Sequence, residues 1–163
     1  GSEEFFVISD KGTTVELLAK YVLNSEATVQ ENKRLETECA FSTDNYWKNE
    51  TLPSSSPYFN LNTYQAVQND TGSAVYKANS YAKSLGAISG RLLTYEEAIS
   101  LKDSYSDIIF VTYGASKYYW LGSAYSTSNV WYVHGNNGDL YNNRFSNIYY
   151  GVRPVIEISK SLI

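Results

Sequence analysis

The chain has 163 residues, of which 43% are hydrophobic, and this length and composition predict one domain spanning residues 1–163 with a sizeable core. Its formal net charge of −4 excludes the basic stripe that neutralises phosphates, so we expect no nucleic-acid partner. No apolar run reaches membrane-spanning length, so direct insertion into a membrane is not expected.

The chain has a single cysteine, Cys39, which cannot form an internal disulfide. We interpret it as a buried, inert residue, with a reactive thiol as the alternative. Gly1-Ser2 is interpreted as the remnant of an expression tag, so a leader or anchor is not excluded.

The N-terminal region predicts a hairpin. Residues 5–8 form a short apolar run, and Asp10-Lys11-Gly12 follows as a turn signal. Residues 15–23 alternate imperfectly and are rich in β-branched and aromatic side chains, which favours a second strand. A helix over the same residues stays open as the alternative. Residues 24–71 are polar and irregular, and the stretch 49–57 predicts a loop.

Two helices are predicted in the middle of the chain. Apolar residues recur at helical spacing over residues 73–86, and Gly86 stands where a C-terminal cap is expected. Thr94 followed three residues later by Glu97 forms a capping box, which predicts a second helix over residues 95–102.

Short apolar runs follow the helices, and some of them are predicted strands. Residues 108–111 and 118–122 are interpreted as buried runs, and residues 130–133 as a strand with a turn at residues 136–138. Residues 152–158 alternate as a closing strand. The predicted order is a pair of strands, then two helices, then several short strands. This order is typical of an α+β fold in which the helices are segregated from the sheet.

Three residues of this last region are expected to be structural. Trp120 and Trp131 stand among apolar neighbours, which predicts core anchors. Arg153 lies beside the closing strand, where an arginine typically ties loops together through backbone carbonyls or a carboxylate. The adjacent Pro154 indicates that the strand begins there or lies at an edge.

The segment 118–156 contains no Lys, Gln, Glu or Met and is dense in Tyr, Asn, Ser and Gly. Tyrosine offers a large contact area with few torsions, whereas Ser, Gly and Asn offer adaptable hydrogen bonding. This composition is typical of a recognition surface and not of an acid–base active site.

The residues that could carry chemistry are sparse. His134, the only histidine, has no neighbouring set of metal ligands or catalytic partners, and is interpreted either as an exposed loop residue or as a contact on the recognition surface. Asp139 with Asn136 and Asn137 offers a single carboxylate to Ca²⁺, so a plain turn is favoured. Motifs for phosphate loops, nucleophile elbows and zinc helices are absent. We therefore expect no enzymatic activity, no cofactor and no metal.

Three segments resemble the formylglycine-generating-enzyme branch of the C-type lectin fold. Residues 90–98 (GRLLTYEEA) resemble the start of a helix of that branch, residues 119–123 (YWLGS) its tryptophan-bearing strand, and residues 150–155 (YGVRPV) its closing strand. The resemblance covers roughly the second half of the chain. It implies a C-type-lectin-like fold with two helices packed on short antiparallel sheets and with the N- and C-terminal strands adjacent.

The chain also departs from that branch. Its enzymes use cysteines for their chemistry, but Cys39 lies outside the matching segments. The Glu-Pro-Asn, Gln-Pro-Asp and Trp-Asn-Asp motifs of calcium-dependent lectins are missing as well. An inactive or divergent enzyme of the branch remains as one alternative.

The remaining pattern resembles the variable proteins of diversity-generating retroelements in phages, bacteria and archaea. In that family, mutation at adenines rewrites the C-terminal segment of a C-type lectin fold. Asn codons then become codons for residues such as Tyr, Ser, Asp, His and Gly, while Lys, Gln, Glu, Met and Trp are not reachable when the third base is a pyrimidine. The resemblance implies that 118–156 is the variable ligand-binding segment. Lectin-like domains of bacterial surface proteins resemble the chain too, and they need no diversification.

These observations predict a non-catalytic ligand-recognition domain on a cell surface, outside the cell or on a phage virion. The expected partner is a protein or glycan on another cell or virus. The alternative is a structural surface module, such as a pilin or an adhesin tip domain. The predicted contact residues combine aromatic anchors with a polar rim: Tyr125, Ser126, Thr127, Ser128, His134, Asn136, Asn137, Asp139, Tyr141, Asn143, Arg144, Phe145, Asn147 and Tyr149.

Overall fold

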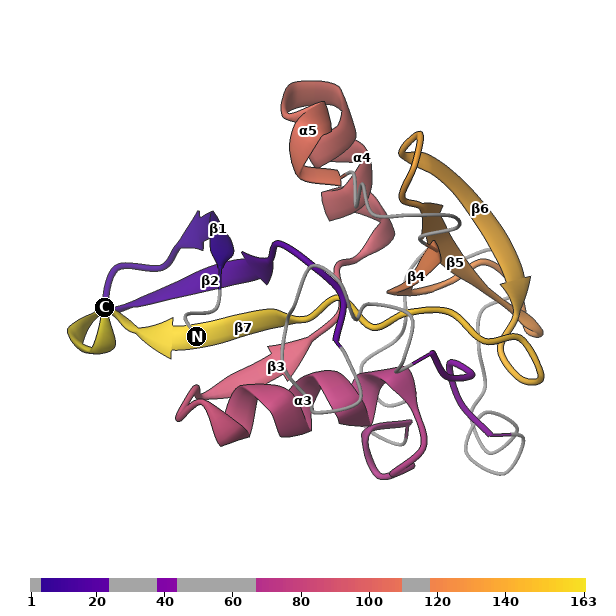
Figure 1. Cartoon of the computed structure of the whole chain (residues 1–163), viewed down its shortest axis with the longest axis horizontal. Coiled ribbons are helices and arrows are strands. Elements are labelled where there is room, and N and C mark those ends of the chain that lie inside the picture. The colour runs from indigo at the N-terminus through magenta and orange to yellow at the C-terminus, as the bar shows by residue number, and fades with distance from the viewer. Residues whose placement is uncertain (1–3, 24–37, 44–66, 110–117) are drawn as a thin grey trace.

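The computed structural model describes residues 4–23, 38–43, 67–109 and 118–163, which form an α+β arrangement with two antiparallel sheets (Figure 1). This confirms the predicted α+β class. The predicted loop at residues 49–57, most of the irregular stretch around it, and residues 110–111 of one predicted buried run lie outside the described residues.

The first sheet has the strand order β1 (Phe5–Asp10), β2 (Thr14–Ala19), β7 (Val155–Ser159) and β3 (Ser89–Arg91). The predicted hairpin is confirmed, and the alternative of a helix over residues 15–23 is wrong. β2 pairs with β7, so the opening hairpin lies beside the closing strand. The first strand itself, β1, lies at the edge of the sheet and is separated from β7 by β2, so the predicted adjacency holds for the hairpin and not for the first strand.

The imperfect alternation of β2 has a physical cause, because both faces of this strand are buried. Val15, Leu17 and Ala19 contribute to one core cluster, and Leu18 contributes to the other. A strand covered on both faces needs apolar side chains at odd and even positions alike.

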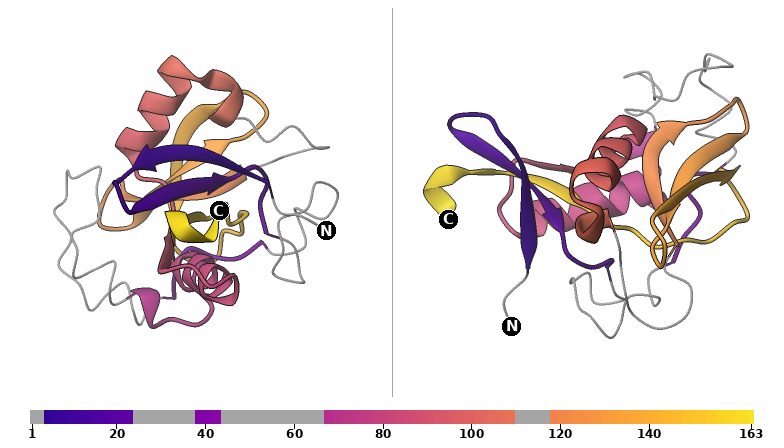
Figure 2. Two further views of the ribbon diagram at one scale, coloured as in Figure 1. Left: turned by 90° about the vertical axis from the view of Figure 1, so that its left-hand side faces the viewer. Right: turned by 90° about the horizontal axis from the view of Figure 1, so that it is seen from above.

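Helix α3 (Ala74–Ser84) begins where the sequence predicts. The Ser73 hydroxyl accepts a hydrogen bond from the Tyr76 amide at 2.9 Å, and Gly86, with a φ of 78°, follows the last turn. The helix packs against β3 and β7 (Figure 2). Contact with β3 requires a glycine at position 90, because a Cβ there would lie 2.3 Å from the carbonyl oxygen of Ala78.

Helices α4 (Tyr95–Ser104) and α5 (Ser106–Ile109) lie on the opposite side of the first sheet from α3 (Figures 1 and 2). The predicted capping box starts α4: the Thr94 hydroxyl accepts from the Glu97 amide, and the Glu97 carboxylate accepts from the Thr94 amide. The helix continues two residues past its predicted end. In the described part of the chain, no helix is long and apolar enough to cross a membrane.

The second sheet has the order β4 (Tyr118–Ala124), β5 (Asn129–His134) and β6 (Asp139–Arg144). It lies at the opposite end of the molecule from the hairpin (Figure 1). The predicted turn between β5 and β6 is present, and it is closed by a hydrogen bond of 2.7 Å from the Gly138 amide to the His134 carbonyl. Gly138 adopts a φ of 74°, which suits glycine.

Arg153 joins the two sheets. Its side chain is fully buried and donates to the carbonyl oxygen of Ala19 at 2.7 Å and to that of Ile109 at 3.3 Å. A third bond of 3.1 Å reaches the Tyr119 hydroxyl, and the guanidinium lies over the Tyr119 ring. The predicted tie through backbone carbonyls is confirmed, and β7 begins directly after Pro154.

Trp120 and Cys39 are buried as predicted. Trp120 is fully buried, and its indole N–H donates to the Cys39 carbonyl at 2.8 Å. Burial raises the pKa of the Cys39 thiol to about 12, so the thiolate is scarce at neutral pH.

Arg91 of β3 links three elements. Its guanidinium donates to Glu16 of β2 at 2.9 Å and to Glu97 of α4 at 2.6 Å. Burial by itself would raise the pKa of Glu97, but the hydrogen bond and charge of Arg91 outweigh burial and lower it.

This pairing predicts an acid-dependent stability. Glu97→Gln keeps an acceptor for the Thr94 amide but removes the charge facing Arg91, and should lower the free energy of unfolding by about 1 kcal/mol at neutral pH. Since the pKa of Glu97 in the folded chain is below the ordinary 4.5, the stabilisation is complete above that pH and is lost as the pH falls through the lowered value.

Urea unfolding of the native chain and of Glu97→Gln across this pH range measures the effect. The stability difference should shrink toward the acid end, whereas Asp103→Asn on the same helix should show little difference at any pH. A difference in free energy of unfolding between the native chain and Glu97→Gln that stays constant with pH would contradict the proposed ion pair of Glu97 with Arg91.

Candidate recognition surface

The register of the second sheet places aromatic side chains on one face. Tyr118 pairs with His134, and Tyr132 lies between Trp120 and Tyr141 on the neighbouring strands. Directly paired residues point to the same side of a sheet. We call this side the aromatic face; it comprises Tyr118, Trp120, Val130, Tyr132, His134, Asp139, Tyr141 and Asn143. Trp120 and Val130 are buried in a core cluster, and the other members are at least partly exposed.

The opposite face of the same sheet is covered by the helices. Tyr119, Leu121 and Val133 are buried in a core cluster that includes Ala98 of α4 and Ile109 of α5. Helix packing on this side fixes the strands, although Trp131, Leu140 and Asn142 of the same side are only half-buried.

Tyr132 is the centre of the aromatic face. Its ring centroid lies 5.6 Å from that of Tyr118, 6.0 Å from that of Tyr141 and 4.3 Å from that of Tyr150, which follows β6. Rings held by each other lose little further freedom when a partner binds. Burial first, and then the neighbouring Tyr150 hydroxyl, raise the pKa of Tyr132, so its phenol stays neutral at physiological pH.

Polar groups at the rim of the aromatic face are already oriented. The side-chain amide of Asn143 donates a hydrogen bond of 3.0 Å to the Tyr150 hydroxyl. The Tyr141 hydroxyl donates one of 3.3 Å to the carboxylate of Asp139. Lys102 of α4 lies 3.0 Å from Asp139, and this hydrogen bond is the main reason that the pKa of Asp139 is lowered. The one carboxylate of the face is therefore balanced by a lysine, and the surface is close to neutral.

The predicted contact residues lie in three places around this sheet. Residues 125–128 form the turn between β4 and β5. His134 and residues 136–137 lie at the end of β5 and in the turn to β6. Residues 139–149 lie along β6 and beyond its end. All of the predicted residues except Phe145 are at least partly exposed.

The structure does not bring all of them into one compact patch. Residues 126–128 lie next to the end of β6, where the Phe145 amide donates to the Ser128 carbonyl at 3.1 Å. His134 and Asp139 are paired at the other end. A six-residue strand is about 17 Å long, so the two groups are separated by that length, with Tyr141 and Asn143 between them.

The prediction for Phe145 is wrong. Its side chain is only 3% exposed and belongs to the core cluster that contains Trp120 and Val130. Strand β6 ends at Arg144, and the chain then turns so that Phe145 enters the interior. Tyr141 and Tyr149, with exposed fractions of 46% and 60%, keep the exposure expected of anchors.

The prediction for Trp131 is also wrong in part. It packs at the margin of the second core cluster but is only half-buried, lying between Tyr95 of α4 at 4.3 Å and Tyr125 at 5.0 Å between centroids. Trp131 is on the helix-covered side, so its contact places Tyr125 near the edge of that side and away from the aromatic face.

His134 is the last residue of β5 and not a loop residue. It is half-buried, and its ring centroid lies 4.6 Å from that of Tyr118 in an edge-to-face contact. Its Nδ1 atom has no hydrogen-bond partner within the described residues. Across the described ranges, no group of three or more His, Cys, Asp or Glu side chains could hold a metal ion.

Sequence reasoning missed Tyr118, Tyr132 and Tyr150 as members of this surface. The signal was present for the first two, because Tyr118 and Trp120, then Val130, Tyr132 and His134, alternate with residues that enter the other core. Tyr150 carries no such signal, since it reaches the sheet by a return of the chain after β6.

The contrast between Phe145 and the exposed tyrosines predicts a difference in stability. Phe145→Ala should lower the free energy of unfolding by about 3 kcal/mol, because it opens a cavity in the core. Tyr141→Ala and Tyr149→Ala should each change it by about 0.5 kcal/mol or a little more. Urea unfolding followed by circular dichroism measures all three. Equal losses would show that the tyrosines are structural and not free for contacts.

The chain was compared with known families, proteins and structures. No family model matches it, and no similar curated protein and no similar solved structure was found. The geometry of the second sheet therefore carries the functional argument.

Proposed function

We propose that the chain is a non-catalytic recognition module with a C-type-lectin-like fold. The arrangement that supports this fold is a hairpin beside the closing strand, a helix on each side of the first sheet, and a short three-stranded sheet at the far end. These features accompany the three sequence segments that resemble that fold, one of which contains the buried Arg153.

The observation that supports this function is that buried and exposed positions within residues 118–156 differ in residue type. Buried positions such as Trp120, Val130 and Val133 hold the sheet in place. Of the 21 exposed or half-buried positions, 17 are Tyr, Asn, Ser, Thr, Asp or His, and the exceptions are Trp131, Leu140, Arg144 and Ile148. A rigid frame with adaptable side chains between its fixed points is the physical requirement for a binding surface that changes its specificity.

The same separation supports the diversified interpretation. Residues reachable from asparagine codons by mutation at adenines gather at exposed sites of the second sheet and its turns, including Asn136, Asn137 and Asn147. The partner is a protein or glycan on another cell or virus, and binding uses the nearly neutral aromatic face together with one of the sheet ends. Because the surface has few free charges, binding should depend little on salt.

The buried Cys39 gives no support to the alternative of an enzyme of the formylglycine-generating branch. Such chemistry needs an accessible thiolate, and burial both hides this sulfur and raises its pKa.

A yeast-display library tests the recognition function. Ser126, Thr127, Asn136, Asn137 and Tyr149 are randomised together, and display is measured with a conformation-sensitive antibody against the native chain. We expect most variants to display at near-native levels, because none of these side chains is buried. Selection against hen lysozyme as an arbitrary target should then yield specific binders.

The matched control randomises Trp120, Val130, Val133, Phe145 and Val152 in the same library format. Display should be lost for most of these variants, since each position is buried. Loss of display in the surface library, or a failure to obtain binders from a well-displayed library, would contradict the proposal.

Diversification is tested on DNA. Sequencing downstream of the gene should show a near-identical repeat of the region encoding residues 118–156, differing at adenine positions only, beside a reverse-transcriptase gene. Differences spread over all four bases, or no repeat, would leave a recognition module that is not diversified.

A further inference from the structure

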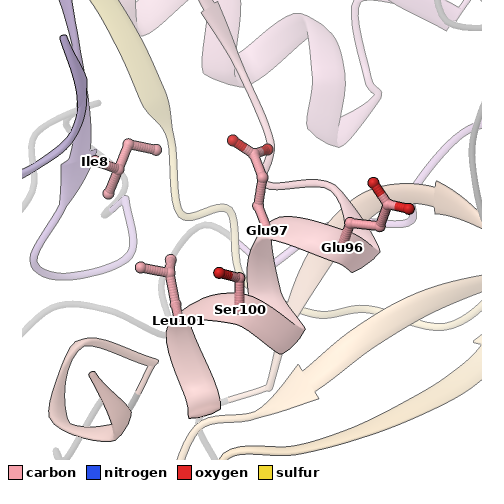
Figure 3. Close-up of a pocket in the computed structure, with 5 residues that line it drawn as sticks. All are labelled: Ile8, Glu96, Glu97, Ser100 and Leu101. Carbon is pink, nitrogen blue, oxygen red and sulfur yellow. The ribbon is translucent and has the colours of Figure 1, made fainter. Parts of the chain in front are cut away.

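A depression of about 300 Å³ lies between β1 and α4. It is lined by Ile8 of β1 and by Glu96, Glu97, Ser100 and Leu101 of α4. Figure 3 shows Ile8 reaching toward the row formed by Glu97, Ser100 and Leu101. None of these residues belongs to the aromatic face, so this is a separate feature of the molecule.

A β-bulge shapes the wall of the depression. In the pairing of β1 with β2, Val7 lies opposite Leu17 and Ser9 opposite Glu16, so Ile8 has no partner residue. Bulges redirect side chains and are frequent beside binding sites. Here the bulge lies where Ile8 contributes an apolar wall opposite Leu101.

The strand that carries Ile8 also has a free edge. β1 is the outermost strand of the first sheet, and within the described residues only β2 pairs with it. Val7 on this strand is 65% exposed. An edge with unpaired backbone groups is the usual docking place for an added strand, whose backbone supplies affinity while pockets select alternate side chains.

The charge around the depression is negative. Glu16 and Glu97 share the guanidinium of Arg91, and Lys11 lies between Glu16 and Glu157 at 3.8 and 3.5 Å. Glu96 is exposed and has no ion pair in the described part of the chain. The two carboxylates of the lining, Glu96 and Glu97, thus face one cation, Arg91, which also binds Glu16, so the depression suits a positively charged group.

We propose that β1 and this depression bind an extended peptide segment of a partner protein through a Lys or Arg side chain. The segment adds to the free edge of β1, and the apolar stem of its basic residue lies between Ile8 and Leu101. The charged head then meets Glu96 and the Ser100 hydroxyl.

A second copy of the chain is a poor occupant of this edge. The lysines near the ends of this strand are already paired, Lys20 with Glu4 at 2.7 Å and Lys160 with Asp10 at 2.6 Å, so a second copy offers no free cation there. The strand itself contains no basic residue to enter the depression. The excess of carboxylates therefore favours a different chain of basic character.

The probe is a capped hexapeptide that alternates Thr and Val around one central Arg, titrated into the ¹⁵N-labelled chain and followed by NMR. We expect shifts at the amides of Val7, Ile8, Glu96 and Ser100. The same peptide with neutral citrulline in place of Arg should bind about fivefold more weakly. N-acetyl-arginine amide, which cannot pair as a strand, should bind more weakly than the peptide.

Variants localise the contact. Glu96→Gln should weaken binding of the Arg peptide by about threefold or more and leave the citrulline peptide unchanged. Asp103→Asn, an exposed acid on the same helix outside the depression, should leave both affinities unchanged. The absence of shifts along β1, equal affinity of the two peptides, or equal affinity of the small amide and the Arg peptide would each overturn the proposal. None of these outcomes depends on the function of the aromatic face.

Discussion

The buried guanidinium of Arg153 is the constraint on which the rest of the structure depends. It donates to carbonyl oxygens from the end of β2 and the end of α5, and to the Tyr119 hydroxyl in β4. A charge removed from water is tolerated only where several acceptors surround it. Because those acceptors come from three distant parts of the sequence, the arginine holds the hairpin, the short helix and the second sheet in one arrangement. The next residue, Pro154, precedes the strand that pairs with the hairpin.

The two faces of the second sheet, which Arg153 holds in place, have different surroundings. The helix-covered face contributes Tyr119, Leu121 and Val133 to the core, which fixes the strands. On the aromatic face, Trp120 and Val130 enter the other core cluster, while the tyrosines around them pack on one another and keep part of their surface exposed. Tyr118, Tyr132 and Tyr150 do both, because a phenol has an apolar ring and a polar tip. These three rings are therefore partly exposed and are also restrained by one another.

Charge is distributed unevenly over the molecule. The aromatic face holds one carboxylate, Asp139, and Lys102 balances it. Carboxylates gather instead around the hairpin and the start of α4, where Lys11, Lys20, Arg91 and Lys160 neutralise some of them but Glu96 has no ion pair in the described part of the chain. The partners proposed for the two surfaces therefore differ: a neutral one recognised by shape and hydrogen bonding, and a basic one attracted by charge. Both rest on the same frame, since Arg91 links the first sheet to α4 while α4 covers the second sheet.

Local signals in the sequence were enough to determine the hairpin, the capped start of α4, the glycine-ended α3, the closing strand after Pro154 and the α+β class. Each of these depends on neighbours within a few residues, through capping, turn chemistry or side-chain period. The polar character of the contact surface was also evident, because composition reports it directly. The sequence could not place Phe145 in the core or Trp131 at its margin, since burial at the end of a strand depends on where the chain turns next. Nor could it gather Tyr150 with Tyr118 and Tyr132, or set Ile8 opposite Leu101. Those contacts join residues far apart in the chain, and only the packing of the two sheets and the helices decides which side chains meet.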